Sequence, residues 1–245
     1  QLEAQRVVAG LLLDGLLLLE LREAVADREG GLVLRLRGLV VAGLAALLGL
    51  LLELLLRDLL GPAIENVIFA FGDVTDADGM LATAKEYGVT RIIHAAAITP
   101  RRHRELAEPK RIIEVNLLGT MNALDTARKL DGFGRFVYVS SCAATGDHPE
   151  LGETNEDTPS TATGLYGITK HTSERICQRY AELYGLDIVA MRPANVYGPM
   201  ERDTPGYKGG TEPREMLRLY AEGKPVLINS LAGPYLDWTY VEDIA

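Results

Sequence analysis

Arg-Phe-Val-Tyr-Val-Ser-Ser, residues 135–141, is a run of β-branched and aromatic residues that turns polar at its end. This composition is typical of a buried strand and predicts that Ser140 and Ser141 emerge at the edge of a sheet. Apolar residues recur at helical spacing after Tyr166, which predicts a long helix with Gly185 as its C-cap. A strand that delivers hydroxyl groups is therefore followed by a helix that begins with Tyr-Gly-Ile-Thr-Lys.

Tyr166 and Lys170 are four positions apart, so they lie one turn apart on the same face of the predicted helix. A free phenol titrates near pH ~10, and a neighbouring ammonium lowers that value because it favours the phenolate. A tyrosine tuned in this way takes a proton from a sugar hydroxyl or returns one to a carbonyl. Tyr-x-x-x-Lys on its own is more often a solvated helix face, so the rest of the chain has to support the catalytic interpretation.

The rest of the chain alternates between predicted strands and helices, which is typical of an α/β fold with a parallel sheet. Strands are expected at 6–9, 32–36, 67–71, 91–97, 135–141 and 186–191, and helices at 11–29, 39–60, 110–129 and 212–223 and from residue 166. We expect a Rossmann-like, doubly wound sheet over residues 1–198, with 236–245 returning to it. Residues 199–235 are expected to form part of a small C-terminal substrate-binding lobe.

The composition narrows the partners and the compartment. With a formal net charge of -9, the chain has no basic footprint, so nucleic acid is not an expected partner. Its two cysteines are too few for a disulfide framework, which favours a reducing, cytoplasmic location, and neither a signal peptide nor a metal site is expected. The apolar run at 39–52 is shorter than the ~20 residues that span a bilayer, so we expect no membrane segment.

The chain contains several motifs whose sequence and order resemble those of the extended short-chain dehydrogenase/reductase family, in particular its NAD-dependent epimerase/dehydratase group. The resemblance covers residues 66–245 and implies a Rossmann fold. It implies NAD as the cofactor, with NADP as the alternative, and a small sugar-like substrate. It also implies a homodimer that forms through the helices that bear Asn116 and Tyr166. The motifs that carry it are Gly72-Asp73-Val74-Thr75-Asp76, His94-Ala95-Ala96-Ala97, Asn116-Leu117-Leu118-Gly119-Thr120, Val139-Ser140-Ser141, Tyr166-Gly167-Ile168-Thr169-Lys170, Arg192-Pro193-Ala194-Asn195-Val196-Tyr197-Gly198-Pro199 and Asp237-Trp238-Thr239-Tyr240-Val241-Glu242-Asp243.

The resemblance also implies a role for each matching residue. Ser141, Tyr166 and Lys170 are the expected catalytic residues, and Ser141, Cys142 and Asn195 are expected to contact the substrate. The expected cofactor-binding residues are Gly10, Asp73, Val74, Ala95, Ala96, Ala97, Asn116, Tyr166, Lys170, Pro193 and Ala194. Asp73 has a simpler alternative role, as a cap for the helix expected to begin near Ala77.

The first cofactor loop departs from the family pattern. Gly10 is the only glycine in register, and leucines at 13 and 16 occupy the positions where bare backbone should approach a pyrophosphate. Leu36 replaces the acid that holds the adenosine ribose, and the arginines at 35 and 37 leave NADP open. This loop predicts weakened cofactor binding, and it makes a non-catalytic Rossmann scaffold the alternative from another functional class.

Two departures bear on the reaction and the substrate. Cys142 and Ala143 stand where 4,6-dehydratases carry an Asp-Glu pair, which disfavours elimination chemistry. Leu236 stands where nucleotide-sugar enzymes often carry an Arg that pairs with a diphosphate. The expectation is a sugar or sugar-acid epimerase or dehydrogenase, with a nucleotide-sugar 4-epimerase as the alternative. Relatives continue beyond this C-terminus, so we expect a truncated chain with an incomplete substrate pocket.

Overall fold

The structure is a computed structural model, and it describes most of the chain from residue 67 onward. The described residues are 67–70, 72–100, 102–148, 150–151, 153–198, 201, 211–226 and 237–244, together with three short strands at 7–9, 24–26 and 32–34. Expectations for Gly10, Leu36, Leu236 and the helix at 39–60 lie outside the described residues.

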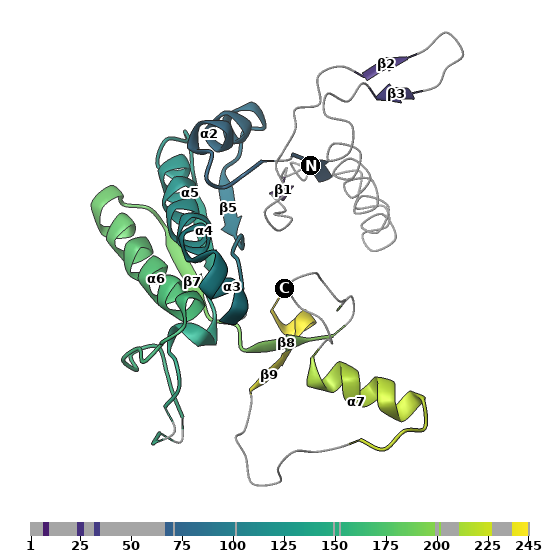
Figure 1. Cartoon of the computed structure of the whole chain (residues 1–245). Coiled ribbons are helices and arrows are strands. Elements are labelled where there is room, and N and C mark those ends of the chain that lie inside the picture. The colour runs from purple at the N-terminus through teal and green to yellow at the C-terminus, as the bar shows by residue number, and fades with distance from the viewer. Residues whose placement is uncertain are drawn as a thin grey trace.

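Three parallel strands form the sheet that positions the site (Figure 1). They are β5 (Arg91–His94), β6 (Arg135–Val139) and β7 (Ile188–Met191), with β6 in the centre. Val137 lies opposite Ile93 on one side and Val189 on the other, so the strands run in step. Their carboxyl ends therefore lie along one edge, as the α/β prediction requires, and the predicted strand at 135–141 is confirmed at its centre.

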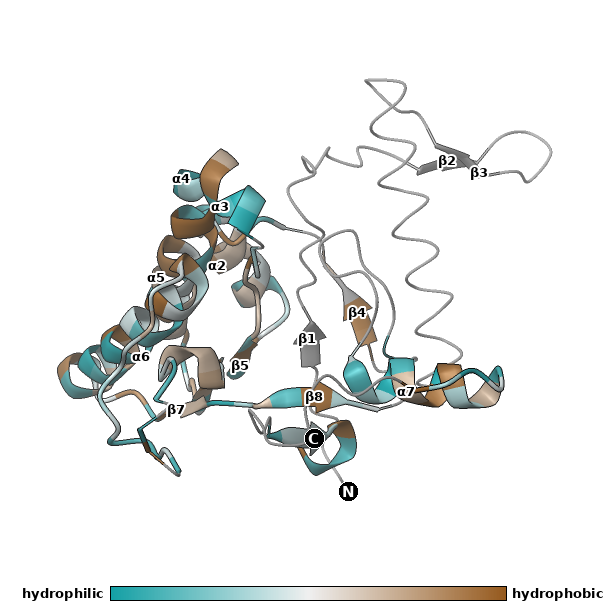
Figure 2. Ribbon diagram, turned by 60° about the horizontal axis from the view of Figure 1, so that its bottom comes forward, coloured by the Kyte–Doolittle hydropathy of each residue, from teal (hydrophilic) through white to brown (hydrophobic). Residues whose placement is uncertain are grey.

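Helix α5 (Gly119–Ala127) packs against β5 and lies between α2 (Ala77–Glu86) and α6 (Leu165–Tyr184), and α6 also packs against β7. Figure 2 shows polar and apolar residues alternating along α6, as expected of a helix with one buried face. The core between these layers takes side chains from α5, β6 and α6: Ala123, Leu124, Ala127, Phe136, Tyr138 and Cys177. This core fixes α6, the helix that bears Tyr166 and Lys170, against the central strand.

The helix predicted at 110–129 contains a wide turn that the sequence did not indicate. The helix consists of α4 (Pro109–Ile113), the wide turn itself, which is the π-helical segment η2 (Glu114–Leu118), and α5. A π turn within an α-helix is rare and is often found at functional sites. Asn116 lies in the middle of this turn and is 2% exposed.

The two ends of helix α6 are capped in different ways. Its N-cap is Gly164, and the backbone N–H of Leu165 donates to Glu105 Oε1 at 2.7 Å. Glu105 belongs to α3 (Arg102–Ala107), so a side chain far away in sequence caps the turn that holds Tyr166. At the other end Gly185 adopts φ 65°, and the predicted C-cap is confirmed.

The N-terminal strands agree only in part with the prediction. Strand β1 (Val7–Ala9) pairs in parallel with β4 (Val67–Phe69), as expected. The helix expected at 11–29 is contradicted at β2 (Ala24–Ala26), which pairs antiparallel with β3 (Leu32–Leu34), so the expected parallel pairing of that strand is wrong as well. The physical reason lies in the sequence, because the β-branched Val25 favours a strand and the glycines at 30 and 31 have low helix propensity.

The C-terminal part contains a second parallel pair. Strand β8 (Asn195–Tyr197) pairs with β9 (Trp238–Tyr240), followed by η4 (Val241–Asp243), and α7 (Glu212–Ala221) lies between the two strands in sequence. The division into a domain at 1–198 and a lobe at 199–235 stays a prediction. No helix in the described part of the chain is long and apolar enough to cross a membrane.

Candidate active site

Lys170 is the buried charge at the centre of the candidate site. It is 3% exposed, and its Nζ donates a hydrogen bond to the carbonyl oxygen of Val139 at 2.6 Å. The same nitrogen lies 5.0 Å from the ring centre of Tyr138 and 5.6 Å from that of Tyr166. Lys170 therefore connects the end of β6, two residues before Ser141, with the ring of Tyr166 one helical turn away.

Burial of Lys170 changes the pH range in which its side chain is charged. Loss of solvent lowers the pKa of Lys170 to about 8, and the negative charge of Glu174 opposes this change. Ammonium and amine forms thus both occur in the mildly alkaline range. An ammonium has three donors and the Val139 carbonyl takes one, so two remain for a ligand such as a ribose.

Ser141 lies in a loop that the strand ends hold on both sides. The N–H of Ser140 donates to the carbonyl of Met191 at 2.8 Å, and the N–H of Cys142 donates to that of Pro193 at 3.1 Å. Ser141 caps the short helix η3 (Cys142–Ala144), because its Oγ accepts the N–H of Ala143 at 3.2 Å. Cys142, an expected substrate contact, is exposed.

Gly167 lets helix α6 approach this loop closely. A Cβ on Gly167 would lie 2.4 Å from the carbonyl oxygen of Ala143 and 2.9 Å from the Cβ of Ala162. No real Cβ tolerates such a contact with backbone, so only glycine fits there without displacement. The turn that begins with Tyr166 thus packs directly on the loop that begins with Ser141.

Asn116 connects the segment after β5 with helix α6. Its Oδ1 accepts the N–H of Ile98 at 2.7 Å, and its Nδ2 donates to the Ile98 carbonyl at 2.9 Å and to Thr169 Oγ1 at 3.1 Å. Thr169 Oγ1 donates in turn to the carbonyl of Tyr166 at 2.9 Å. The amide thereby fixes the segment after Ala95, Ala96 and Ala97 and leaves none of its own polar atoms unpaired.

Asp73 lies just after β4 and does not cap the next helix. That cap is Asp76, which accepts the N–H of Gly79, so the capping alternative for Asp73 is wrong. Asp73 accepts from the N–H and the hydroxyl of Thr75 at 2.9 and 2.8 Å and from Arg111 at 2.7 Å. Partial burial raises the pKa of Asp73, but these donors outweigh it and the net pKa is lowered.

Asp73 and Lys170 both keep hydrogen-bonding capacity for a ligand. An ionised carboxylate has about four acceptor positions, so three donors leave Asp73 about one. Val74 beside it contacts α5, since a Cβ on Gly119 would lie 2.5 Å from Val74 Cγ2, and the Val74 carbonyl accepts from Asn122 at 2.9 Å. Lys170 offers its spare donors at the other end.

The remaining predicted residues follow β7. Pro193 and Ala194 are half-buried at its carboxyl end. Asn195 uses both its backbone N–H and its side-chain amide, each at 3.1 Å, to bind the carbonyl of Asp237. In this structure Asn195 thus binds the residue that precedes β9. Its contact with a substrate stays a prediction.

The sequence analysis assigned no role to Glu105, Glu174 or Arg192, although Arg192 begins one of the matching motifs. Glu105 caps the helix of Tyr166, and Glu174 forms a two-point ion pair with Arg192 at the end of β7. Only Glu174 had a local signal, because it continues the four-residue spacing of Tyr166 and Lys170.

Comparison with known proteins identifies the family of the chain. The chain matches the NAD dependent epimerase/dehydratase family over residues 50–245. It is 30% identical over 184 residues to the UDP-glucuronate 4-epimerase of Thermodesulfobacterium geofontis, covering 74% of this chain and 53% of that protein.

Solved structures of UDP-glucose 4-epimerases have the same fold. The enzyme of Thermotoga maritima, determined with UDP-glucose, has a TM-score of 0.63 at 26% identity, with 74% of this chain and 57% of that one covered. The enzyme of Thermus thermophilus, determined with NAD, has a TM-score of 0.58 at 28% identity, with 74% and 60% covered. The chain spans about half the length of the curated relatives it matches. By sequence and by fold, the chain belongs to the NAD-dependent epimerase/dehydratase family.

Proposed function

We propose that this chain bears the catalytic groups of an NAD-dependent epimerase that acts on a secondary alcohol of a sugar or sugar acid. The observation that supports it is the position of Lys170, whose buried ammonium bridges the Val139 carbonyl and the ring of Tyr166. Burying a lysine costs stability, and a perturbed lysine beside a tyrosine is typical of proton-transfer sites.

In this proposal each of three residues has one task. Tyr166 takes the proton from the substrate hydroxyl and returns it after the carbonyl has formed, acting as general base and then general acid. Protonated Lys170 stabilises the phenolate and hydrogen-bonds the ribose with its spare donors. Ser141 hydrogen-bonds the reacting oxygen, where a donor fixed in advance stabilises the developing charge.

Residues along the sheet edge would hold the cofactor. Asp73 and Val74 would bind the adenine end, the Ala95–Ala97 segment would lie along the ribose-phosphate part, and Pro193 and Ala194 would border the nicotinamide. NAD, when bound, supplies the hydride acceptor. NADP stays the alternative cofactor.

A nucleotide-sugar 4-epimerase is the second candidate, and a specific observation favours it. Relatives named UDP-glucuronate 4-epimerase and UDP-glucose 4-epimerase match the chain in sequence and in fold. Leu236 favours an unlinked sugar, since leucine cannot pair with a diphosphate. Incubation with UDP-glucose, UDP-glucuronate and the corresponding free sugars, with epimers separated by chromatography, distinguishes the two substrate classes.

The decisive variant is Tyr166→Phe, which removes the hydroxyl and keeps the ring. We expect it to lose turnover by at least about 100-fold, within the range for loss of a general acid–base. Epimerisation leaves the cofactor unchanged overall, whereas a dehydrogenase would accumulate reduced nicotinamide, so one absorbance trace separates these activities. Retained turnover in Tyr166→Phe would contradict the proposed role.

The non-catalytic scaffold stays testable without any substrate. Trp238 is the single tryptophan of the chain and lies in β9, so its fluorescence is a convenient signal for NAD titration. Saturable binding supports the enzyme, and absence of binding at millimolar NAD by both fluorescence and calorimetry favours the scaffold.

A further inference from the structure

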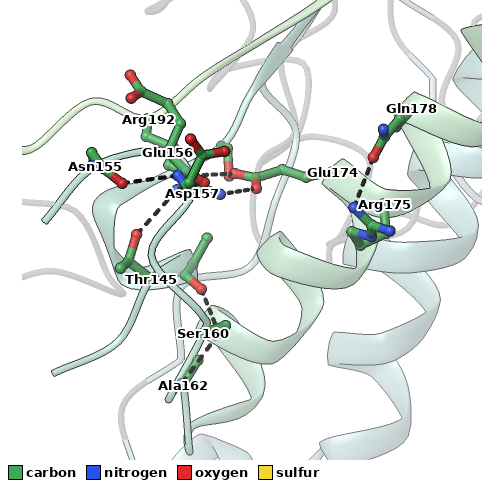
Figure 3. A network of polar contacts seen from close by, with 12 residues as sticks. Thr145, Asn155, Glu156, Asp157, Ser160, Ala162, Glu174, Arg175, Gln178 and Arg192 are labelled. Carbon is green, nitrogen blue, oxygen red and sulfur yellow. Dashed lines mark hydrogen bonds and ion pairs between the residues drawn. The ribbon is translucent and has the colours of Figure 1, made fainter. Parts of the chain in front are cut away.

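The carboxylate of Glu174 binds side chains at the ends of two neighbouring strands, and Figure 3 shows its contact with Arg192. It accepts the hydroxyl of Ser140 at 2.5 Å and two nitrogens of Arg192 at 2.9 and 2.6 Å. The side chains of Glu174 and Arg192 are 11% and 22% exposed. A two-point, charge-assisted contact of this kind fixes direction as well as distance.

This contact lies beside the backbone that presents Ser141. Ser140 immediately precedes Ser141, and its N–H already donates to Met191, the neighbour of Arg192. Glu174 adds a side-chain bridge between the same two strand ends. The orientation of Ser141 therefore depends on backbone pairing and on one carboxylate that reaches across from α6.

Glu174 also lies on the face of α6 that bears the proposed catalytic pair. Tyr166, Lys170 and Glu174 are spaced four residues apart, so they form one stripe along the helix. The negative charge of Glu174 opposes the lowering of the Lys170 pKa by burial. The other titratable groups around Lys170 are His94 on β5, Tyr138 on β6 and Tyr166 on α6.

Neither His94 nor Tyr138 supplies a negative charge near neutral pH. Burial and Lys170 lower the pKa of His94 to about 4, so His94 is neutral. Burial raises the pKa of Tyr138, so that ring stays protonated. Burial raises the pKa of the Glu174 carboxyl group, but the hydrogen bonds from Arg192 and Ser140 and the charges of Arg192 and His171 outweigh it, so the net pKa is lowered and Glu174 remains ionised.

Arg192 extends the contact to the loop that follows η3. Its Nη1 donates to Thr145 Oγ1 at 3.3 Å and to the carbonyl of Glu156 at 3.5 Å (Figure 3). A hydrogen bond from Ser160 Oγ to the Ala144 carbonyl, at 2.6 Å, connects the same loop to η3. One ion pair thus joins the loop that borders Ser141 to the helix of Tyr166.

We propose that Glu174 and Arg192 are positioning residues of the Tyr166–Lys170 site: they fix the strand ends that present Ser141 and balance the charge of Lys170. The inference rests on the proposed function for its effect on turnover. Its physical basis, the effect of Glu174 on Lys170 and on the loop, is independent of any substrate.

Glu174→Gln tests the inference, because it keeps the shape and removes the charge. NMR of lysine labelled at the side chain gives the pKa of Lys170, with its signal assigned by its absence in Lys170→Met. We expect the Lys170 pKa to fall by at least about half a pH unit, since removing an anion destabilises the ammonium. Glu182→Gln is the matched control: it lies on the same helix, pairs with Arg179 at 2.9 Å and should leave Lys170 unchanged.

The kinetic readout separates positioning from simple stability. Since protonated Lys170 is the active form, the alkaline limb of the rate profile should move to lower pH in Glu174→Gln. For a pKa that falls by half a pH unit from about 8, turnover should drop about 2-fold at pH 8 and about 3-fold at pH 9, and it should nearly recover at pH 7. An overall loss of folded protein would instead lower the rate equally at every pH.

The double variant Glu174→Gln/Arg192→Gln keeps the test decisive if the single variant does not fold, since it leaves no unpaired buried charge. An unchanged Lys170 pKa in a folded variant that lacks the Glu174 charge would overturn the inference. Retained turnover in Tyr166→Phe would overturn the proposed function instead, and the pKa measurement would still decide the role of Glu174.

Discussion

Replacing Lys170 with methionine should reveal how much stability the fold gives up to keep a charge in its core. Lys170 is 3% exposed, and its pKa lies at about 8 in place of 10.5. Methionine has a similar length and no charge, so Lys170→Met removes the titration and keeps most of the packing.

The magnitude and its sign follow from the two pKa values. One pH unit corresponds to 1.36 kcal/mol, so the change from 10.5 to about 8 is worth about 3 kcal/mol. Below pH 8 both states hold the proton, and the folded state bears this full penalty. Between pH 8 and 10.5 the unfolded chain binds more protons, so the stability of the parent protein rises with pH through this window.

The assay is urea unfolding of the parent and Lys170→Met between pH 7 and 10.5. The difference in free energy of unfolding, variant minus parent, should decrease by about 3 kcal/mol over this range. The loss of the hydrogen bond to Val139 shifts that difference by a constant and does not affect its slope. A difference that stays constant with pH would refute the claim that burial lowers the pKa of Lys170.

Two further substitutions test the packing of the site. Gly167→Ala places a Cβ 2.4 Å from the Ala143 carbonyl, so we expect turnover to fall about 100-fold, because a displacement of ~1 Å costs about that much, while stability falls by less than about 2 kcal/mol in urea unfolding. Gly185→Ala, at φ 65° on the far end of the same helix, is its control and should lower stability by about 1 kcal/mol without changing the rate of folded enzyme. Asn116→Leu leaves both backbone polar groups of Ile98 unpaired and should lower the free energy of unfolding by about 3 kcal/mol, measured in the same way; a loss below about 1 kcal/mol would contradict the role of this amide.

Local features of the structure could be predicted from sequence because their causes are local. Gly185 ends α6 in the left-handed conformation that glycine favours, and the four-residue spacing of Tyr166 and Lys170 places both on one helical face. Hydrophobic runs located the strands of the central sheet for the same reason. The roles of these residues rest on the resemblance and on the proposal above.

Contacts between distant segments could not be predicted in this way. Glu105 caps α6 from another helix, and Arg192 meets Glu174 only because β7 and α6 are packed side by side. The spacing of Glu174 from Lys170 is local, but no local pattern indicates either contact. The prediction of a helix at 11–29 failed for a different reason, since β2 (Ala24–Ala26) lies within that range. An apolar run without clear periodicity is compatible with a helix or a strand.

The most direct test of the central claim is a single-turnover reaction with bound NAD. Parent protein and Tyr166→Phe, both saturated with NAD by titration, are mixed with substrate while the absorbance of reduced nicotinamide is followed. The account predicts that the parent reduces its bound NAD rapidly and that Tyr166→Phe, with equal NAD affinity, does so at least about 100-fold more slowly. Reduction at the same rate in both proteins would contradict the assignment of proton transfer to Tyr166.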